Sequence, residues 1–377
     1  MKILIKSAFA AIFVVMFFGL SNCKKDDNSD NDNTIDSTLT DWDELGGTNN
    51  SPFQTTIYNI AADQAGNIYV GGGYGGEISV WNGTNWDSLG SVVSSPFTAG
   101  VYWPITVDPT GNVFAVGMIS VPLANSEYHI GKWDKNTDTW INLTTEGQPM
   151  FNNGVTSIVS DAAGNIYVAG NNLNTPEPGK IITKWNGSYW SQLGDTIPSG
   201  DNVILHVDAT GNVHAALGIT NNNFCEYVAR WNGSSWVELG GASTADFGTG
   251  QIMSITSDSA GNIYAAGFWN KNNVINNVAK WDISTNSWSF LTGIPTPYVA
   301  NSIVADNSGN LYAGGRFLNT EGRMYVAKWN GSSWSNVGNL NPNNPINAVC
   351  VAANGKVYAG GDFTNSNSRY YVAVHAK

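Results

Sequence analysis

The stretch VAKWNGSSWSNVG, residues 326–338, places two tryptophans around an Asn-Gly pair. Nearly the same string, VARWNGSSWVELG, stands at residues 228–240. Asn-Gly between two short alternating segments is a strong local signal for a type I′ β-hairpin. Trp329 and Trp334 are therefore expected on one side of a hairpin, where both rings can pack on a neighbouring sheet. The stretch predicts the outer half of a repeated β-sheet unit.

A second pattern, IxxIxxDxxGNIYxxG, precedes each hairpin and predicts the inner half of the unit. An apolar strand leads into a turn that the Asp can cap and the Gly can close, and a second strand follows. The seven copies lie at residues 57–72, 101–117, 155–170, 202–218, 252–267, 301–315 and 346–361. A period of about 48 residues with four strands per unit predicts an all-β fold, a seven-bladed β-propeller.

The two ends of the repeat region complement each other. TDWDELGG, residues 40–47, matches a fourth strand with no third strand before it, and YYVAVHAK, residues 370–377, matches a third strand with no fourth. We therefore expect the N-terminal strand to pair with the C-terminal strands and close the ring, which removes an open sheet edge. The propeller is predicted to span residues 40–377. Thirteen of the 15 tryptophans fall at repeat positions and are interpreted as structural, the exceptions being Trp103 and Trp269.

The first residues predict export. Residues 1–22 combine two lysines with the apolar run AFAAIFVVMFFGL, which is shorter than the roughly 20 residues of a membrane-spanning helix and typical of a signal peptide. The run ends in LSNC, which resembles the lipobox of bacterial lipoproteins, with Cys23 as the lipidated residue. The following KKDD is similar to the surface-export signal of Bacteroidota lipoproteins. These resemblances imply a lipid anchor and display on the extracellular side of the outer membrane; the alternative is an ordinary secretory signal.

The segment after the cysteine and the overall composition limit the partners. Residues 23–39 are acidic and Asn-rich and are predicted to form a disordered tether. The net charge of −12 disfavours nucleic acid as a partner. Besides Cys23 only Cys225 and Cys350 are present, in distant repeats, so no disulfide framework is expected. We expect a monomer stabilised by packing.

The repeat resembles kelch repeats in three respects: a Gly-Gly pair ends the second strand, an aromatic residue lies on the third, and a tryptophan lies on the fourth. WDKNTDTW, residues 133–140, is close to the kelch hairpin itself. The GNIYVGG half is also similar to the seven-bladed repeats of bacterial surface proteins. The resemblance implies the fold alone, because kelch-like propellers include adaptor proteins, glycan-binding modules and a copper oxidase.

The links between repeat strands indicate which face binds. Turns between the first and second strands and between the third and fourth are short and uniform, and lie on one face. The remaining links, such as SVVSSPFTAG at 91–100 and NNLNTPEPGK at 171–180, are long and irregular. Variable loops on a rigid scaffold usually carry binding, so we expect the ligand site on the loop-rich face, around the mouth of the central channel.

Four residues on that face are candidate ligand contacts. Tyr58 and Trp103 occupy equivalent positions at the start of an inner strand. The repeat does not require a tryptophan at Trp103, which would stack on a sugar ring or anchor a peptide; the alternative is burial under the next loop. Arg316 and Asp362 follow the Gly-Gly pairs of adjacent blades, where they either grip a ligand or pair with each other.

Neither a metal site nor a cofactor is predicted. A capping residue is needed in every turn, and a single carboxylate falls short of the six to eight oxygens that calcium takes, so the DxxGN aspartates are interpreted as caps. His214 and His375 replace repeat aromatics, and the four histidines give neither a copper ligand set nor a catalytic constellation.

The sequence therefore favours a surface-anchored, non-enzymatic propeller that binds an extracellular glycan or protein. Asn-rich, weakly charged loops suit neutral polyols, since amides hydrogen-bond hydroxyls and rings stack on sugars. Two alternatives stay open: a hydrolase or lyase acting on polysaccharide from the same face, and a pure protein-interaction scaffold in an outer-membrane complex. Two carboxylates close together at the channel mouth would favour the enzyme.

Overall fold

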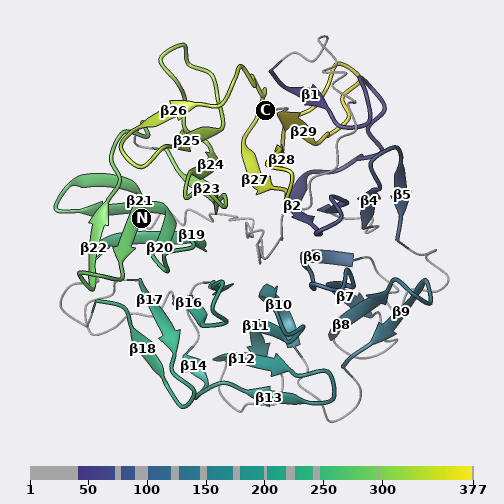
Figure 1. The fold of residues 1–377 in the computed structure, drawn as a ribbon, viewed down its shortest axis with the longest axis vertical. Helices are drawn as coiled ribbons and strands as arrows, with labels where there is room; N and C mark the ends of the chain where they lie inside the picture. Colours follow the sequence, from purple (N-terminus) through teal and green to yellow (C-terminus); the bar gives the residue numbers. More distant parts are fainter. Residues whose placement is uncertain are drawn as a thin grey trace, which may run out of the picture.

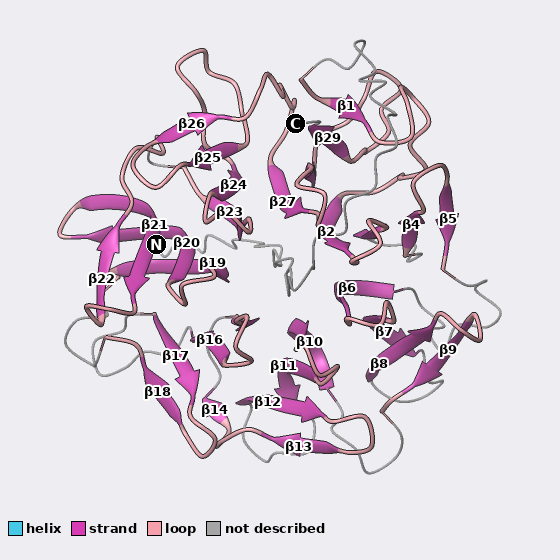
Figure 2. Ribbon diagram, in the orientation of Figure 1, coloured by secondary structure: helices cyan, strands magenta, loops and turns pink. Residues whose placement is uncertain are grey.

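The computed structural model describes residues 41–72, 78–89, 101–119, 127–144, 151–172, 179–198, 202–217, 226–240, 247–295 and 298–375. All regular elements in these residues are β-strands. None of the described residues forms a helix long and apolar enough to cross a membrane. The strands form sheets arranged radially around a central axis (Figure 1, Figure 2). This is the seven-bladed β-propeller that the repeat predicts.

Each blade is an antiparallel sheet whose first strand lies nearest the axis. Blade 1 contains β2 (Ile57–Ala62), β3 (Ile68–Gly72), β4 (Ser79–Trp81) and β5 (Trp86–Ser88), and blade 2 contains β6 (Val101–Val107), β7 (Val113–Ile119), β8 (Glu127–Asp134) and β9 (Thr139–Asn142). Blade 3 contains β10 (Phe151–Ser160), β11 (Ile166–Asn172), β12 (Gly179–Trp185), β13 (Trp190–Gln192) and the short β14 (Ile197–Pro198). Blade 4 contains β15 (Val203–Val207), β16 (Val213–Leu217), β17 (Tyr227–Trp231) and β18 (Trp236–Glu238), and blade 5 contains β19 (Thr249–Ser257), β20 (Ile263–Lys271), β21 (Val274–Asp282) and β22 (Ser287–Phe290). Blade 6 contains β23 (Ala300–Ala305), β24 (Leu311–Gly315), β25 (Ala327–Trp329) and β26 (Trp334–Asn336), and blade 7 contains β27 (Ile346–Val351), β28 (Val357–Gly361), β29 (Ala373–His375) and β1 (Asp43–Glu44).

Blade 7 confirms the predicted closure of the ring. Its fourth strand is β1, and Asp43 pairs with Val374 at the outer edge of β29 (Figure 1). The backbone N–H of Leu45 continues the ladder by donating to the Val372 carbonyl at 2.8 Å. The first and last described strands are thus held in one sheet, which completes the seventh blade.

A repeated hydrogen bond joins each blade to the one before it. In blade 3, the indole Nε1–H of Trp190 donates to the carbonyl of Leu143 in blade 2, at 2.9 Å. The carbonyl always belongs to the residue three positions after the preceding blade's own fourth-strand tryptophan. The same bond is made by Trp42, Trp86, Trp140, Trp236, Trp288 and Trp334. In every blade, the fourth-strand tryptophan therefore contributes a hydrogen bond to the preceding blade as well as the packing of its ring.

The turn between the first and second strands is closed by its aspartate, as predicted. In blade 3, Asp161 Oδ1 accepts the backbone N–H of Asn165 at 2.9 Å, and Oδ2 accepts the Asn165 side-chain amide at 2.6 Å. Gly164 has φ 80°, a conformation that a residue with a side chain adopts only with strain. The same Asp–Asn pairing closes the turns at Asp63, Asp108, Asp208, Asp258 and Asp306.

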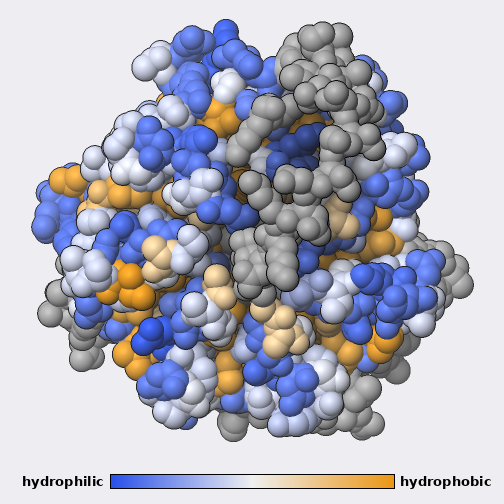
Figure 3. Space-filling model, viewed as in Figure 1, coloured by the Kyte–Doolittle hydropathy of each residue, from blue (hydrophilic) through white to orange (hydrophobic). Residues whose placement is uncertain are grey.

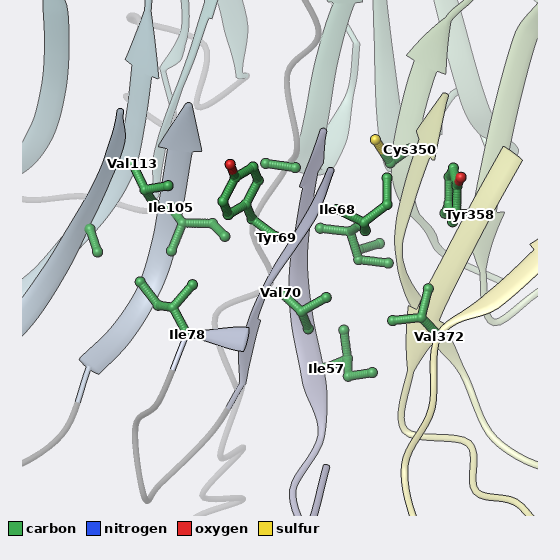
Figure 4. Close-up of a cluster of buried hydrophobic side chains, with 14 of the residues drawn as sticks. Ile57, Ile68, Tyr69, Val70, Ile78, Ile105, Val113, Cys350, Tyr358 and Val372 are labelled. Carbon is green, nitrogen blue, oxygen red and sulfur yellow. The ribbon is translucent and has the colours of Figure 1, made fainter. Parts of the chain in front are cut away.

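A glycine pair ends the second strand of blades 1, 6 and 7 and permits close packing against the next blade. A Cβ added at Gly314 in blade 6 would lie 2.5 Å from Ile346 Cγ2 and 2.6 Å from Val349 Cγ2, both on the inner strand of blade 7. Figure 4 shows the corresponding packing of blade 1, where Val70 lies among apolar side chains of its own and adjacent blades. The core is thus a set of layers between blades.

Two departures from a uniform repeat are present. The beginnings of β8 and β10 pair, with Phe151 opposite Tyr128, so blades 2 and 3 share one nine-stranded sheet. In blade 5, β20 and β21 extend beyond the other blades and meet at a two-residue turn, Asn272-Asn273, with φ 54° and 64°. Positive φ at both positions is the type I′ geometry, which Asn tolerates.

Candidate functional site

The two faces of the ring differ in their connections. We call the face carrying residues 63–67 and 82–85 of blade 1, and their equivalents, the turn face. The opposite face, where the second strand leads to the third and each blade leads to the next, is the loop face. Most of the long irregular links that the sequence singles out, including residues 91–100 and 173–178, lie outside the described residues. Figure 3 shows one face of the molecule, on which hydrophilic residues surround scattered apolar patches.

The inner strands carry a register irregularity at their loop-face end. In β2, Ile57 pairs with Gly72 and Asn59 with Gly71, so Tyr58 is an extra residue in this strand, a β-bulge. Trp103 lies in the corresponding irregularity of β6, between Tyr102 and Ile105. Equivalent bulges place Thr156, Met253, Asn301 and Asn347 in the same position. A bulge changes the direction in which a side chain points. The backbone at the position predicted for ligand contact therefore differs from that of the regular strand on either side.

Two bulge residues that the sequence did not nominate hold neighbouring blades together. Asn301 is fully buried, and its Nδ2 donates to the carbonyl of Ile346 in the next blade at 3.0 Å. Asn347 is 1% exposed, and its Nδ2 lies 3.4 Å from the Ile57 carbonyl. These amides therefore reinforce the ring. Tyr58, in the same position, is half-exposed.

Arg316 and Asp362 occupy matching places at the ends of adjacent second strands. The backbone N–H of Arg316 donates to the Val299 carbonyl, and that of Asp362 to the Pro345 carbonyl, each at 2.9 Å. Arg316 is exposed and Asp362 half-buried. Asp362 Oδ1 accepts the amide of Asn347 at 3.0 Å. Among the described residues, no ion pair within 4.0 Å joins Arg316 to Asp362, so the predicted alternative of mutual pairing is not what the structure shows.

The other residues singled out in the sequence are described only in part or lie outside the described residues. The backbone of Trp103 lies in β6, and its side chain lies outside the described residues. Cys23, the predicted signal peptide 1–22 and the predicted tether 23–39 also lie outside them, as does Cys225. Cys350 is a free, buried thiol whose pKa is raised to about 12 by burial.

Trp269 is a packing residue, as its apolar counterparts in the repeat predict. It is fully buried at the base of the blade 5 hairpin, together with its equivalents Phe317 and Phe363. Its ring centroid lies 5.1 Å from that of Phe247, which in turn lies 4.8 Å from Trp288. This aromatic group supports the long β20–β21 hairpin, which projects on the loop face.

Two histidines lie close together between blades 4 and 5. His206 Nε2 is 2.7 Å from Ser257 Oγ, and His214 Nε2 is 3.0 Å from Asp208 Oδ2. Burial, and then the neighbouring His214, lowers the pKa of His206 to about 3. A general base works best with a pKa near the operating pH, so His206 is poorly suited to activate the serine. Burial opposes ionisation of Asp208, but hydrogen bonds from His214, Asn212 and Thr210 hold its pKa well below the ordinary range.

The described acidic side chains are largely occupied by the fold. Within the described ranges, no group of three or more His, Cys, Asp or Glu side chains is arranged to hold a metal ion. In blade 3, Tyr167 donates its hydroxyl to Asp161 Oδ2 at 2.9 Å. Burial first, and then the charge of Asp161, raises the pKa of this phenol. The buried Asp–Asn–Tyr arrangement is therefore a structural unit of the turn.

An open hollow lies among the described residues of the turn face, which the sequence did not indicate as a binding face. It has a volume of about 210 Å³ and lies between the first turns of blades 6 and 7. Its lining residues are Ala305, Asp306, Asn307, Ser308, Val351, Ala352, Ala353, Asn354 and Gly355. The sequence feature that could have indicated this hollow is Ala352, which replaces the turn aspartate of the other six repeats.

Comparisons with known proteins define the class of the fold. No protein-family model and no curated protein matches the sequence. Among solved structures, the chain is similar to YCF48 bound to D1 peptide, with TM-score 0.60 and 11% identity over 90% of this chain and 98% of that one. It is also similar to virginiamycin B lyase from Staphylococcus aureus, with TM-score 0.61 and 13% identity over 89% and 99%. A third is the GH74 xyloglucanase from Xanthomonas campestris, with TM-score 0.57 and 13% identity over 88% of this chain and 55% of that one.

These similarities support the propeller scaffold. At 11–13% identity they carry the fold alone, and the three propellers have different functions. Propellers of this class serve both as binding proteins and as enzymes. The function of this chain therefore depends on the side chains that it presents.

Proposed function

We propose that the protein is a binding propeller that holds a polypeptide partner on its loop face. The observation that carries this proposal is the pair Arg316 and Asp362: opposite charges at matching places in adjacent blades that do not form an ion pair with each other. Their backbones are fixed by equivalent hydrogen bonds, so the main chain at these two positions needs little ordering on binding. A polypeptide can present both an acidic and a basic group to two such side chains.

Two further observations support binding of a polypeptide. The YCF48 propeller, which shares the fold, is described in complex with a peptide. The described histidines and turn carboxylates are engaged in blade interfaces and turns, as at His206 and Asp161, which favours binding over catalysis. A polysaccharide-acting hydrolase or lyase on the same face is the enzymatic alternative, and a hydrolase would need two carboxylates close together at the channel mouth.

Tyr58 favours a second candidate, an extracellular glycan as the ligand. Its half-exposed ring lies at a bulge beside the channel mouth, where it can stack on a sugar ring. The xyloglucanase among the similar structures is a propeller protein named for a polysaccharide substrate. The two candidates differ in the side chains they require: Tyr58 for the glycan, and Arg316 with Asp362 for the polypeptide.

A displayed library of short peptides, selected on the full-length protein in detergent, tests the leading proposal. We expect selected peptides to carry both an acid and a base, and Arg316→Glu or Asp362→Lys to weaken binding about tenfold or more, as expected for loss of a charge-assisted contact. Arg323→Glu is the matched control, because Arg323 is an exposed arginine of blade 6 that pairs with Glu321 at 3.3 Å. Selection of no peptide, with binding on a glycan array that Tyr58→Ala abolishes, would replace the polypeptide with the glycan.

We also propose that lipidation at Cys23 anchors this propeller to the outer membrane on the extracellular side, with residues 23–39 as the tether. The support is the sequence around Cys23 and the kelch-like, surface-protein character of the repeat. Radiolabelled palmitate should label the wild-type protein and Cys225→Ser, and should not label Cys23→Ser. Labelling of the Cys23→Ser protein would reject the anchor.

A further inference from the structure

The first turn of blade 7 keeps the backbone of the other turns without their aspartate. The N–H of Ala352 donates to the Lys356 carbonyl at 3.0 Å, and the N–H of Gly355 to the Ala352 carbonyl at 2.8 Å. Gly355 has φ 78°, like the turn glycine of every other blade. The main chain is therefore the same as at Asp306 in blade 6, and the difference lies in the side chains.

In blade 6, the turn shows how this main chain binds a carboxylate. Asp306 Oδ1 accepts the backbone N–H groups of Ser308 at 2.8 Å and Asn310 at 2.9 Å. Its Oδ2 accepts the Asn310 side-chain amide at 2.8 Å and the Tyr312 hydroxyl at 3.2 Å. Four donors thus converge on one carboxylate, and charge-assisted bonds of this kind are stronger than neutral ones.

Blade 7 retains most of these donors and lacks the carboxylate. Tyr358 stands at the position of the hydroxyl donor and is 4% exposed. The N–H of Lys356 corresponds to that of Asn310 and is held at 3.0 Å by the side-chain oxygen of the exposed Asn354. An exposed neutral contact of this kind is easily exchanged for a carboxylate.

The local charge changes in the direction that favours an anion. Compared with blade 6, Ala352 removes one negative charge and Lys356 replaces a neutral asparagine with a positive one. Lys356 is exposed, and in the described part of the chain no carboxylate lies within 4.0 Å of its Nζ. Asp306 lines the other side of the hollow, with its carboxylate turned into its own four donors.

We propose that the hollow between the first turns of blades 6 and 7 binds a carboxylate group of a polypeptide, in the place that the turn aspartate fills in the other blades. The backbone N–H and the ammonium of Lys356 are the principal donors. Ala352 carries only a methyl group where the other turns carry an aspartate side chain, so the ligand's carboxylate can occupy that place. This site lies on the turn face, so the proposal stands independently of the loop-face function.

The size of the hollow indicates a single group as the occupant. Its volume of about 210 Å³ is below the roughly 300–1,000 Å³ of pockets that enclose a drug-sized ligand. Asn307, Ser308 and Asn354 around it are neutral hydrogen-bonding residues suited to the peptide groups beside an acidic residue. An aspartate or glutamate side chain, or a chain terminus, meets these requirements.

Backbone amide NMR of the full-length protein, titrated with four probes, tests the proposal. The probes are acetyl-Gly-Glu-Gly-amide, the matched acetyl-Gly-Gln-Gly-amide, acetyl-triglycine with a free carboxyl terminus, and galacturonate. We expect the glutamate peptide to shift the amide signals of Asn354, Gly355 and Lys356, and the glutamine peptide to leave them unchanged. The triglycine arm shows whether a side-chain or a terminal carboxylate fits better.

Three variants make the test specific. Ala352→Asp with Lys356→Asn restores the residues of the other turns, so this double variant should fold, melt at a higher temperature and no longer bind the glutamate peptide. Lys356→Gln should weaken binding about tenfold, the effect of losing one charge-assisted contact. Lys135→Gln, at an exposed lysine next to the equivalent turn of blade 2, should leave binding unchanged.

Three results would overturn the proposal. The first is equal shifts with the glutamate and glutamine peptides, which would mean that the carboxylate is not recognised. The second is undiminished binding of the glutamate peptide by the double variant Ala352→Asp with Lys356→Asn, which would place binding elsewhere. The third is tighter binding of galacturonate than of either carboxylate peptide, which would assign the site to acidic glycans.

Discussion

Trp42 donates its indole N–H to the carbonyl of Val337 at 2.7 Å, across 295 residues of sequence. The same bond joins Trp190 to Leu143 at 2.9 Å between two consecutive blades. The joint that closes the ring is therefore chemically the same as the joints made along the chain. Its cost in chain entropy is larger, because the segments it connects are far apart in sequence.

Replacing Trp42 with phenylalanine tests the contribution of this donor. The ring contact with His375, at a centroid distance of 5.2 Å, can be kept while the Nε1–H is lost. We expect the free energy of unfolding to fall by at least about 1 kcal/mol, because one hydrogen bond is lost and the smaller phenyl ring also packs less completely. Urea denaturation measures the change. Trp190→Phe should lose a similar amount, and a cost at Trp190 with none at Trp42 would show that the closing joint is not formed in solution.

The glycine pair should tolerate substitution differently in blades 1 and 6. Gly314→Ala places a methyl group 2.5 Å from Ile346, and overpacking of this kind costs about 1–3 kcal/mol. Gly71 is the equivalent residue of blade 1, where the added Cβ would be 3.4 Å from Ile105, an ordinary contact distance. Thermal unfolding of the two variants should show a clearly larger loss for Gly314→Ala. Equal losses would mean that blade spacing does not determine the requirement for glycine.

Calcium should not stabilise the protein through the DxxGN turns. The carboxylate of Asp161 is already bound by backbone N–H groups, an asparagine amide and a tyrosine hydroxyl. We expect the melting temperature to be the same with millimolar calcium and with EDTA. Asp161→Ala, in contrast, should lower the free energy of unfolding by about 1–3 kcal/mol, because buried donors lose their acceptor. A calcium-dependent melting temperature that Asp161→Ala abolishes would contradict the capping role.

The buried His206 should make stability depend on pH. Its pKa is lowered to about 3 by burial and then by His214, whereas the unfolded chain has the ordinary value of 6.5. Between these values the unfolded state binds the additional proton, so the free energy of unfolding rises with pH. This one group contributes a slope approaching about 1.4 kcal/mol per pH unit.

His206→Gln isolates this contribution. Denaturation of the variant from pH 4.5 to 6.5 should show a shallower slope than that of the wild type. Asp208 also has a lowered pKa, but its contribution falls mainly below pH 3.8, outside this range. Identical slopes for the two proteins would show that His206 is accessible to protons in the folded state.

The propeller was predictable because its signals are local and repeated. The Asn-Gly pair between Trp329 and Trp334 specifies a hairpin, and the Asp-to-Asn spacing specifies the other turn. Seven repeats of these two short patterns then predict a ring of seven blades. The shared sheet of blades 2 and 3 was not predictable, because the pairing of Tyr128 with Phe151 joins segments outside the repeat.

The candidate site was predictable only in part. Equivalent positions identified Arg316 and Asp362 as neighbours, but the lack of an ion pair between them depends on side-chain geometry. The bulge at Tyr58 is a register irregularity that no residue type indicates. The hollow lies beside Ala352, which lacks the carboxylate that the aspartates of the other six turns carry. The consequence of that replacement can be recognised only from the hydrogen bonds that those aspartates make in the structure.

The pairing of β1 with β29 also fixes when the molecule can finish folding. A ribosome makes the N-terminal partner of that pair first and its C-terminal partner about 330 residues later, which at 5–20 residues per second takes roughly 20–60 s. Until β29 is present, β1 has no strand to pair with and the ring cannot close. The strand β29 must therefore be made before the propeller can become a closed and cooperative unit.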